Sequence, residues 1–193
     1  MLNIEYRVNK DTLNCINTHD KPDIYGVFVI ASDFGMSLRD FSMIEDGVFE
    51  LFDFNDNLFI WFWNISLMNV EILKNDKSSF VIGYDLDNLP PYKGILFQRN
   101  GDILYTYEIS CHDEIDYEFN KIPPKNYDII KSNDGICVYD WLIKCTNITN
   151  EFLREIISYN QELTKNQYIN LIFSYIYLIN KSIDSKLLAS SKK

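Results

Sequence analysis

The chain has 193 residues, of which 47% are hydrophobic and 15% aromatic, and it carries a net charge of −10 with a pI near 4.6. This apolar content excludes intrinsic disorder, and the length favours one domain over residues 1–193. The acidic balance is the opposite of what a general nucleic-acid binder needs, so we expect no nucleic-acid partner.

The first half of the chain shows strand patterns. Residues 2–8 alternate apolar and polar side chains, and residues 24–31 form a more continuous apolar run; both predict strands. The next apolar stretch, residues 58–63, reads Leu-Phe-Ile-Trp-Phe-Trp without alternation, which predicts a strand covered on both faces. With residues 48–54 and the intervening Asn-Asp-Asn it predicts a central aromatic hairpin. Residues 65–73 and 80–84 are predicted as further strands.

A second hairpin is expected around Asn100-Gly101, where the flanking residues 94–98 and 103–109 are rich in isoleucine, leucine and aromatic residues. Asn-Gly accepts the positive φ angles of a tight hairpin turn. The pattern places Arg99 opposite Asp102 as a cross-strand pair of opposite charge.

The last fifty residues change character. Residues 149–163 have apolar side chains at helical spacing, with Thr149 as the expected N-cap. Thr164 to Gln167 fits a capping box that opens a second helix, whose apolar core extends from Ile169 to Ile179. That core is shorter than the roughly 20 residues of a membrane span, so no membrane partner is expected. The helix is interpreted as a core helix against the sheet or as one half of a homodimer interface.

These patterns predict an α+β fold, with a mostly antiparallel, aromatic-rich sheet and two C-terminal helices packed on it. Residues 1–143 are expected to be mainly β and residues 144–193 helical. Residues 144–193 carry seven Lys or Arg and four Asp or Glu, a net charge of +3, which leaves −13 for residues 1–143. The negative charge is therefore expected on the sheet.

Chemistry-bearing residues are sparse. The four cysteines are widely spaced, and the N-terminus lacks the pattern of a signal peptide, so the expected location is the cytoplasm, with reduced thiols. Cys111 and His112 are adjacent in an extended segment, where neighbouring side chains point to opposite faces, so they do not form a nucleophile–base pair. No metal-ligand spacing or phosphate loop is present. The sequence predicts neither an enzyme nor a cofactor.

The densest charge lies in residues 111–120, where acidic residues alternate with Ile115, Tyr117 and Phe119. The period of two predicts an exposed strand or extended segment. The acidic side chains could bind a hard cation, but the segment lacks the glycine and the regular ligand spacing of a calcium-binding loop. A solvated acidic face is therefore favoured. Tyrosine and charge interleaved on an exposed segment suit a protein contact, which gives five candidate partner-binding residues: Asp113, Glu114, Asp116, Tyr117 and Glu118.

The chain resembles the immunity proteins of bacterial polymorphic and contact-dependent growth inhibition toxin systems. The resemblance rests on the Met-Leu-Asn-Ile-Glu-Tyr start at residues 1–6, on Gly-Met-Ser-Leu-Arg-Asp at residues 35–40 and on the acidic sheet, over roughly the first 120 residues. It implies an antitoxin: a stoichiometric inhibitor of a cognate, co-produced protein toxin, often a nuclease.

Two other hypotheses stay open. A small-molecule enzyme could use paired carboxylates, which would need a concave pocket lined by tyrosine and two carboxylates. A self-associating accessory protein would pair through the helix at residues 169–179.

Overall fold

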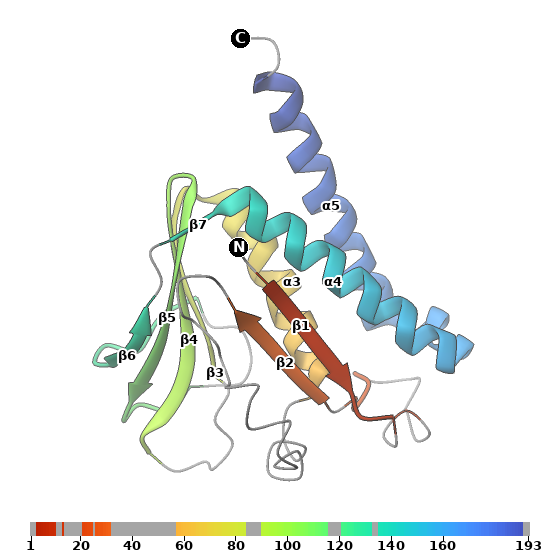
Figure 1. The fold of residues 1–193 in the computed structure, drawn as a ribbon, viewed down its shortest axis with the longest axis horizontal. Coiled ribbons are helices and arrows are strands. Elements are labelled where there is room, and N and C mark those ends of the chain that lie inside the picture. The colour runs from red at the N-terminus through yellow and green to blue at the C-terminus, as the bar shows by residue number, and fades with distance from the viewer. Residues whose placement is uncertain are drawn as a thin grey trace.

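The computed structural model describes residues 3–10, 13, 21–24, 26–31, 57–83, 90–115, 121–132 and 135–190. Two sheets and three long helices make up the described part (Figure 1). The α+β fold class predicted from the sequence is confirmed, and the strand pairs are antiparallel.

The first sheet pairs β1 (Asn3–Val8) with β2 (Gly26–Ala31), close to the predicted strands. The second sheet has the order β3 (Lys77–Gly83), β4 (Tyr92–Asn100), β5 (Ile103–Cys111) and β6 (Asp128–Ser132), with the two-residue β7 (Ile136–Cys137) also paired to β5. β6 therefore lies at an edge.

The predicted strand at residues 58–63 is wrong, because these residues begin α3 (Leu58–Lys74). Asn57 caps the helix: its side-chain oxygen accepts hydrogen bonds from the backbone N–H groups of Phe59, at 3.0 Å, and Ile60, at 3.3 Å. The helix extends through residues 65–73, so the strand predicted there is wrong as well. The central hairpin consequently does not form as predicted, and its other half, residues 48–54, lies outside the described residues.

α3 is the centre of the core. Its buried side chains recur at helical spacing, and it contacts β2, β3 and the two later helices, α4 (Val138–Tyr159) and α5 (Gln167–Ser190). Phe62 stacks on Phe152 of α4 with ring centroids 4.3 Å apart, and the indole N–H of Trp141 donates to Asn69 Oδ1 at 2.8 Å. Residues 1–143 therefore contain a long buried helix besides the predicted strands.

The β4–β5 hairpin is confirmed, but its turn is shifted by one residue. Asn100 pairs with Ile103, so the loop is Gly101 and Asp102, and Gly101 has a φ of 63°. The predicted Arg99–Asp102 pair is wrong: Arg99 lies opposite Leu104, and its guanidinium is buried against the end of α3.

The C-terminal helices exist, but their predicted starts are wrong. α4 begins at Val138, so Thr149 is a buried interior residue whose hydroxyl donates to the Cys145 carbonyl oxygen at 2.7 Å. A short 3-10 helix, η2 (Gln161–Lys165), follows, and Asn166 rather than Thr164 caps α5 by accepting from the Tyr168 and Ile169 N–H groups.

α4 contacts β1, β5 and β7, whereas α5 packs on α3 and α4 as an outer layer (Figure 1). Ile169, Ile172, Ile176, Ile179 and Ile183 of α5 are buried at helical spacing. In the described part of the chain, no helix is long and apolar enough to cross a membrane.

Candidate functional site

The predicted partner-binding segment begins where β5 ends. Asp113 and Glu114 are exposed, but β5 stops at Cys111, so residues 112–115 do not continue the predicted strand. Asp116, Tyr117 and Glu118 lie outside the described residues.

Two buried residues hold the exposed part of this segment in place. On one side, the Cys111 thiol donates to the Asp113 carbonyl oxygen at 3.0 Å. On the other side, Ile115 is buried in a small cluster with Val81, Leu96, Ile109 and Cys111, which we call the outer cluster. His112, Asp113 and Glu114 between these anchors face solvent, so the two carboxylates are presented from a fixed stretch of backbone.

Gly94 of β4 makes the anchor at Ile115 possible. A Cβ atom at this position would lie 3.1 Å from Ile115 Cδ1 and 2.9 Å from the Ile82 carbonyl oxygen. These separations are tighter than ordinary carbon contacts, so only glycine leaves room for Ile115 to pack on the sheet. Ile115 of the acidic segment thus packs on the face of the β3–β4–β5 sheet that carries Val81, Leu96 and Ile109.

A groove of about 730 Å³ opens beside this segment. One wall is formed by residues 110–113 at the end of β5, and the other by residues 125–128, which lead into β6. Asp113 and Asp128 contribute carboxylates from the two walls, Lys125 contributes an ammonium group, and Tyr127 packs against the outer cluster. We call this feature the acidic groove.

The groove's thiol is not set up as a nucleophile. Burial, and secondarily the charge of Asp113, raises the pKa of Cys111 above its ordinary value. A thiol is reactive as the thiolate, which a raised pKa disfavours at neutral pH. The groove is therefore better suited to binding than to covalent chemistry.

Sequence reasoning missed Tyr127 and Asp128 as site residues. They belong to a short run of uncertain type, and only the pairing of β5 with β6, which sets Ser110 opposite Asp128, brings them to the acidic segment. Such a pairing between distant strands leaves no local signal; the only hint was a tyrosine and an aspartate preceding two isoleucines.

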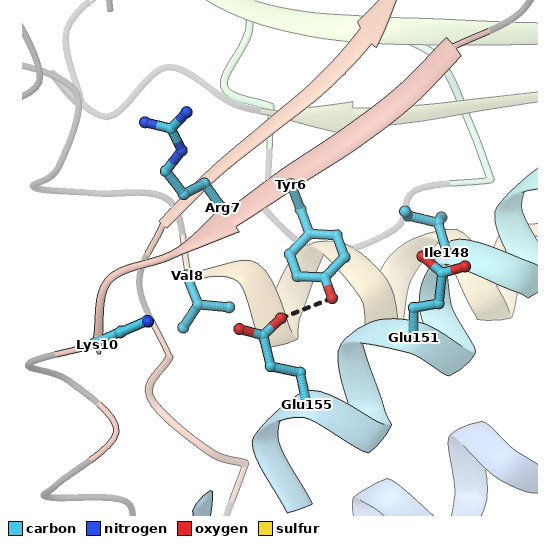
Figure 2. A pocket seen from close by; sticks show the side chains of 7 residues that line it. All are labelled: Tyr6, Arg7, Val8, Lys10, Ile148, Glu151 and Glu155. Carbon is cyan, nitrogen blue, oxygen red and sulfur yellow. Dashed lines mark hydrogen bonds between the residues drawn. The ribbon is translucent and has the colours of Figure 1, made fainter. Parts of the chain in front are cut away.

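A second concave site lies between β1 and α4 and has a volume of about 380 Å³ (Figure 2). Tyr6 and Val8 point from β1 toward the helix, whereas Arg7 points away, as strand alternation requires. Glu151 and Glu155 project from α4. This is the combination of tyrosine and two carboxylates that the enzyme hypothesis required.

The hydrogen bonding here favours a structural role. The Tyr6 hydroxyl donates to Glu155 Oε2 at 2.8 Å, and burial, together with this bond and the nearby carboxylates, raises the pKa of Tyr6 far above its ordinary value. Tyr6 therefore keeps its proton at neutral pH and cannot act as a base. Its ring contacts Phe62 and Phe152 edge-on, with centroid distances of 5.5 and 5.6 Å. The Tyr6–Glu155 bond thus joins β1 to α4.

The carboxylates of Glu151 and Glu155 both lie on the α4 side of this second site. Glu151 and Glu155 are one helical turn apart on α4, so they lie side by side. An acid–base pair of the glycosidase kind flanks the bond that it cleaves. Among the described residues, no group of three or more His, Cys, Asp or Glu could hold a metal ion.

The helix predicted for self-association does expose apolar side chains. Leu171, Tyr177 and Leu178 of α5 are 40%, 66% and 48% exposed. They lie on the side of α5 away from α3 and α4, and a homodimer through this face stays a prediction.

Comparison with known proteins finds no family model, no curated protein and no solved structure that matches the chain.

Proposed function

We propose that this protein is a cytoplasmic immunity protein that neutralises a cognate toxin by binding a basic, nuclease-type toxin domain in the acidic groove. The observation that supports this most is the bracketed acidic segment: Asp113 and Glu114 stand exposed between two buried anchors, Cys111 and Ile115. These anchors fix the backbone position from which the two carboxylates reach solvent.

The charge distribution supports the same proposal. Residues 1–143 carry a net −13, and the groove faces solvent with carboxylates on both walls. Complementary charge speeds the encounter of two proteins and selects among partners. Tyr127 adds the kind of large, partly apolar side chain that contributes strongly to binding. An inhibitor of this kind binds stoichiometrically and transforms nothing.

The experiment measures binding to the toxin domain encoded by the gene immediately upstream. The groove variant combines Asp113→Lys and Asp128→Lys, which line the groove, with Glu114→Lys, which is exposed next to it in the chain. The control variant makes the same change in net charge at exposed acidic residues outside the groove: Asp140→Lys, Glu151→Lys and Asp184→Lys.

Each exposed ion pair contributes about 0.2–1 kcal/mol, and reversal turns attraction into repulsion. We therefore expect the groove variant to raise Kd about 100-fold, since each 1.4 kcal/mol is about tenfold. The control should change Kd only by the smaller, general effect of net charge. Equal loss in both variants, or no loss in the groove variant, would overturn the proposal.

A further inference from the structure

β6 leaves one edge of the main sheet open. Its residues pair with β5 on one side, from Ser110 opposite Asp128 to Tyr107 opposite Ser132, and no other strand in the described part of the chain pairs with its other side. Figure 1 shows β6 at the outer margin of the molecule, away from the helices. Unpaired backbone N–H and C=O groups on such an edge can pair with another chain.

Two of the five residues of this edge strand are exposed isoleucines. Ile129 is 54% exposed and Ile130 is 47% exposed, and Ile122 in the preceding segment is 84% exposed. Native edges are commonly protected by charge or proline, or by a bulge. β6 contains Lys131, and its register irregularity leaves Ile130 without a partner on β5, yet two consecutive isoleucines remain open to solvent.

The apolar surface of the edge is continuous with the outer cluster. Ile129 lies opposite Ile109, which is fully buried in that cluster. Cross-strand neighbours share one face of a sheet, so Ile129 extends the cluster to the edge of the sheet. A partner placed there would cover apolar surface that this chain leaves exposed.

Charge identifies the kind of partner. Asp128 is the first residue of β6 and also lines the acidic groove with Asp113. A second copy of this chain would bring its own net charge of −10 toward these carboxylates, which opposes self-pairing. A basic segment would instead place its lysines or arginines over them, so the edge favours a cationic partner over self-pairing.

We propose that β6 accepts an additional strand: an extended segment of a basic protein pairs with its backbone, places apolar side chains on Ile129 and Ile130, and extends its basic side chains toward Asp128 and the groove. This recognition mode obtains affinity from main-chain hydrogen bonds and specificity from alternate side chains. The inference rests on the proposed function in that the cognate toxin would supply the segment.

The test uses a defined probe and does not require the toxin. The probe is a synthetic peptide of about seven residues, a usual strand length, that alternates lysine with isoleucine. Two controls keep its length: one replaces lysine by glutamate, and the other places proline at the centre, which removes a ladder hydrogen bond. Backbone amide hydrogen exchange of the full protein is followed with and without each peptide.

We expect the lysine peptide to slow exchange of the β6 amides by about tenfold or more, and neither control to do so. The variant Ile129→Gln with Ile130→Gln should lose this protection. The matched variant Leu171→Gln with Leu178→Gln, which changes two exposed leucines of α5, should keep it. Both variants alter exposed side chains, so the fold is expected to survive.

Three results would overturn the inference: no protection of β6 by the lysine peptide, equal protection by the glutamate peptide, or protection of β6 in a dimer of the free protein. Failure of the proposed function looks different. In that case the upstream toxin domain does not bind, or binds independently of the groove carboxylates, whatever the peptide does at β6.

Discussion

Replacing Arg99 by methionine should destabilise the protein by about 2–4 kcal/mol, mainly because it leaves buried backbone without a hydrogen-bond partner. The guanidinium donates to the carbonyl oxygens of Ile72, near the end of α3, and Gly101, in the β4–β5 turn, and forms an ion pair with Asp76 at 2.8 Å. Its side chain is only 2% exposed, whereas that of Asp76 is 82% exposed.

These exposures set the magnitude. Asp76 can be solvated when its partner is removed, so the ion pair contributes no more than about 1 kcal/mol. The Ile72 carbonyl cannot be solvated as easily, and an orphaned buried acceptor costs about 1–3 kcal/mol. Methionine keeps most of the apolar stem, which limits the loss of packing.

Urea denaturation followed by circular dichroism measures this difference. The matched variant is Asp102→Asn. The sequence predicts Asp102 as the partner of Arg99, whereas in the structure Asp102 Oδ1 lies 3.5 Å from Lys186 Nζ and both side chains are exposed. Asp102→Asn should change the free energy of unfolding by less than about 0.5 kcal/mol. If Arg99→Met is equally mild, or if Asp102→Asn is the costlier change, the assigned contacts of Arg99 are wrong.

Three further substitutions test other parts of the structure. Tyr6→Phe should lower the free energy of unfolding by about 1 kcal/mol at neutral pH, because it removes the hydrogen bond to Glu155. Because folding raises the pKa of Tyr6, the wild type should lose stability as the pH rises above about 10, and the variant should lose less. Denaturation measured across that pH range checks both expectations. Asn166→Ala removes the cap of α5 and should lower the free energy of unfolding by about 1 kcal/mol, whereas Thr164→Ala should stay within about 0.5 kcal/mol, so equal effects would contradict the cap assignment. Ile115→Ala should lower the free energy of unfolding by about 2–4 kcal/mol. It should also weaken toxin binding without any change of charge, because the acidic segment loses its second anchor. Titration with the toxin domain checks this, and unchanged affinity in the folded variant would show that the anchor is irrelevant to binding.

Local patterns predicted the strands near residues 2–8, 24–31 and 80–84 and the β4–β5 hairpin, although its turn is shifted by one residue, because alternation and turn signals act over a few residues. The same logic failed at residues 58–63 and 65–73, which form one helix. A short run that is apolar on every side fits a strand covered on both faces as well as a buried helix, and only tertiary packing distinguishes them. Asn57 carried the missing signal, since asparagine before an apolar run is a preferred helix cap.

The helix starts illustrate a different limit. Thr149 and Thr164 fit N-cap patterns, but Thr149 lies on the buried face of a helix that had already begun at Val138, where its hydroxyl bonds to the preceding turn. Capping residues occur inside helices too, so the pattern alone does not locate a boundary.

The candidate site was only half accessible to sequence reasoning. Dense charge pointed to Asp113 and Glu114, which are exposed as expected. The opposite wall of the groove, with Tyr127 and Asp128, depends on the pairing of β5 with β6, and the anchor at Ile115 depends on the close approach to Gly94. Both are long-range contacts, which no local period encodes.

The most direct test of the acidic groove as a toxin-binding surface is the affinity for the upstream-encoded toxin domain at about 50 and about 300 mM salt, concentrations between which exposed charges become strongly screened. Titration calorimetry should show a one-to-one complex whose affinity falls at least tenfold at the higher salt. In the variant with Asp113, Glu114 and Asp128 changed to lysine, most of this salt dependence should be gone. A complex whose affinity is the same at both salt concentrations, or no complex at all, would contradict the proposed role of the groove.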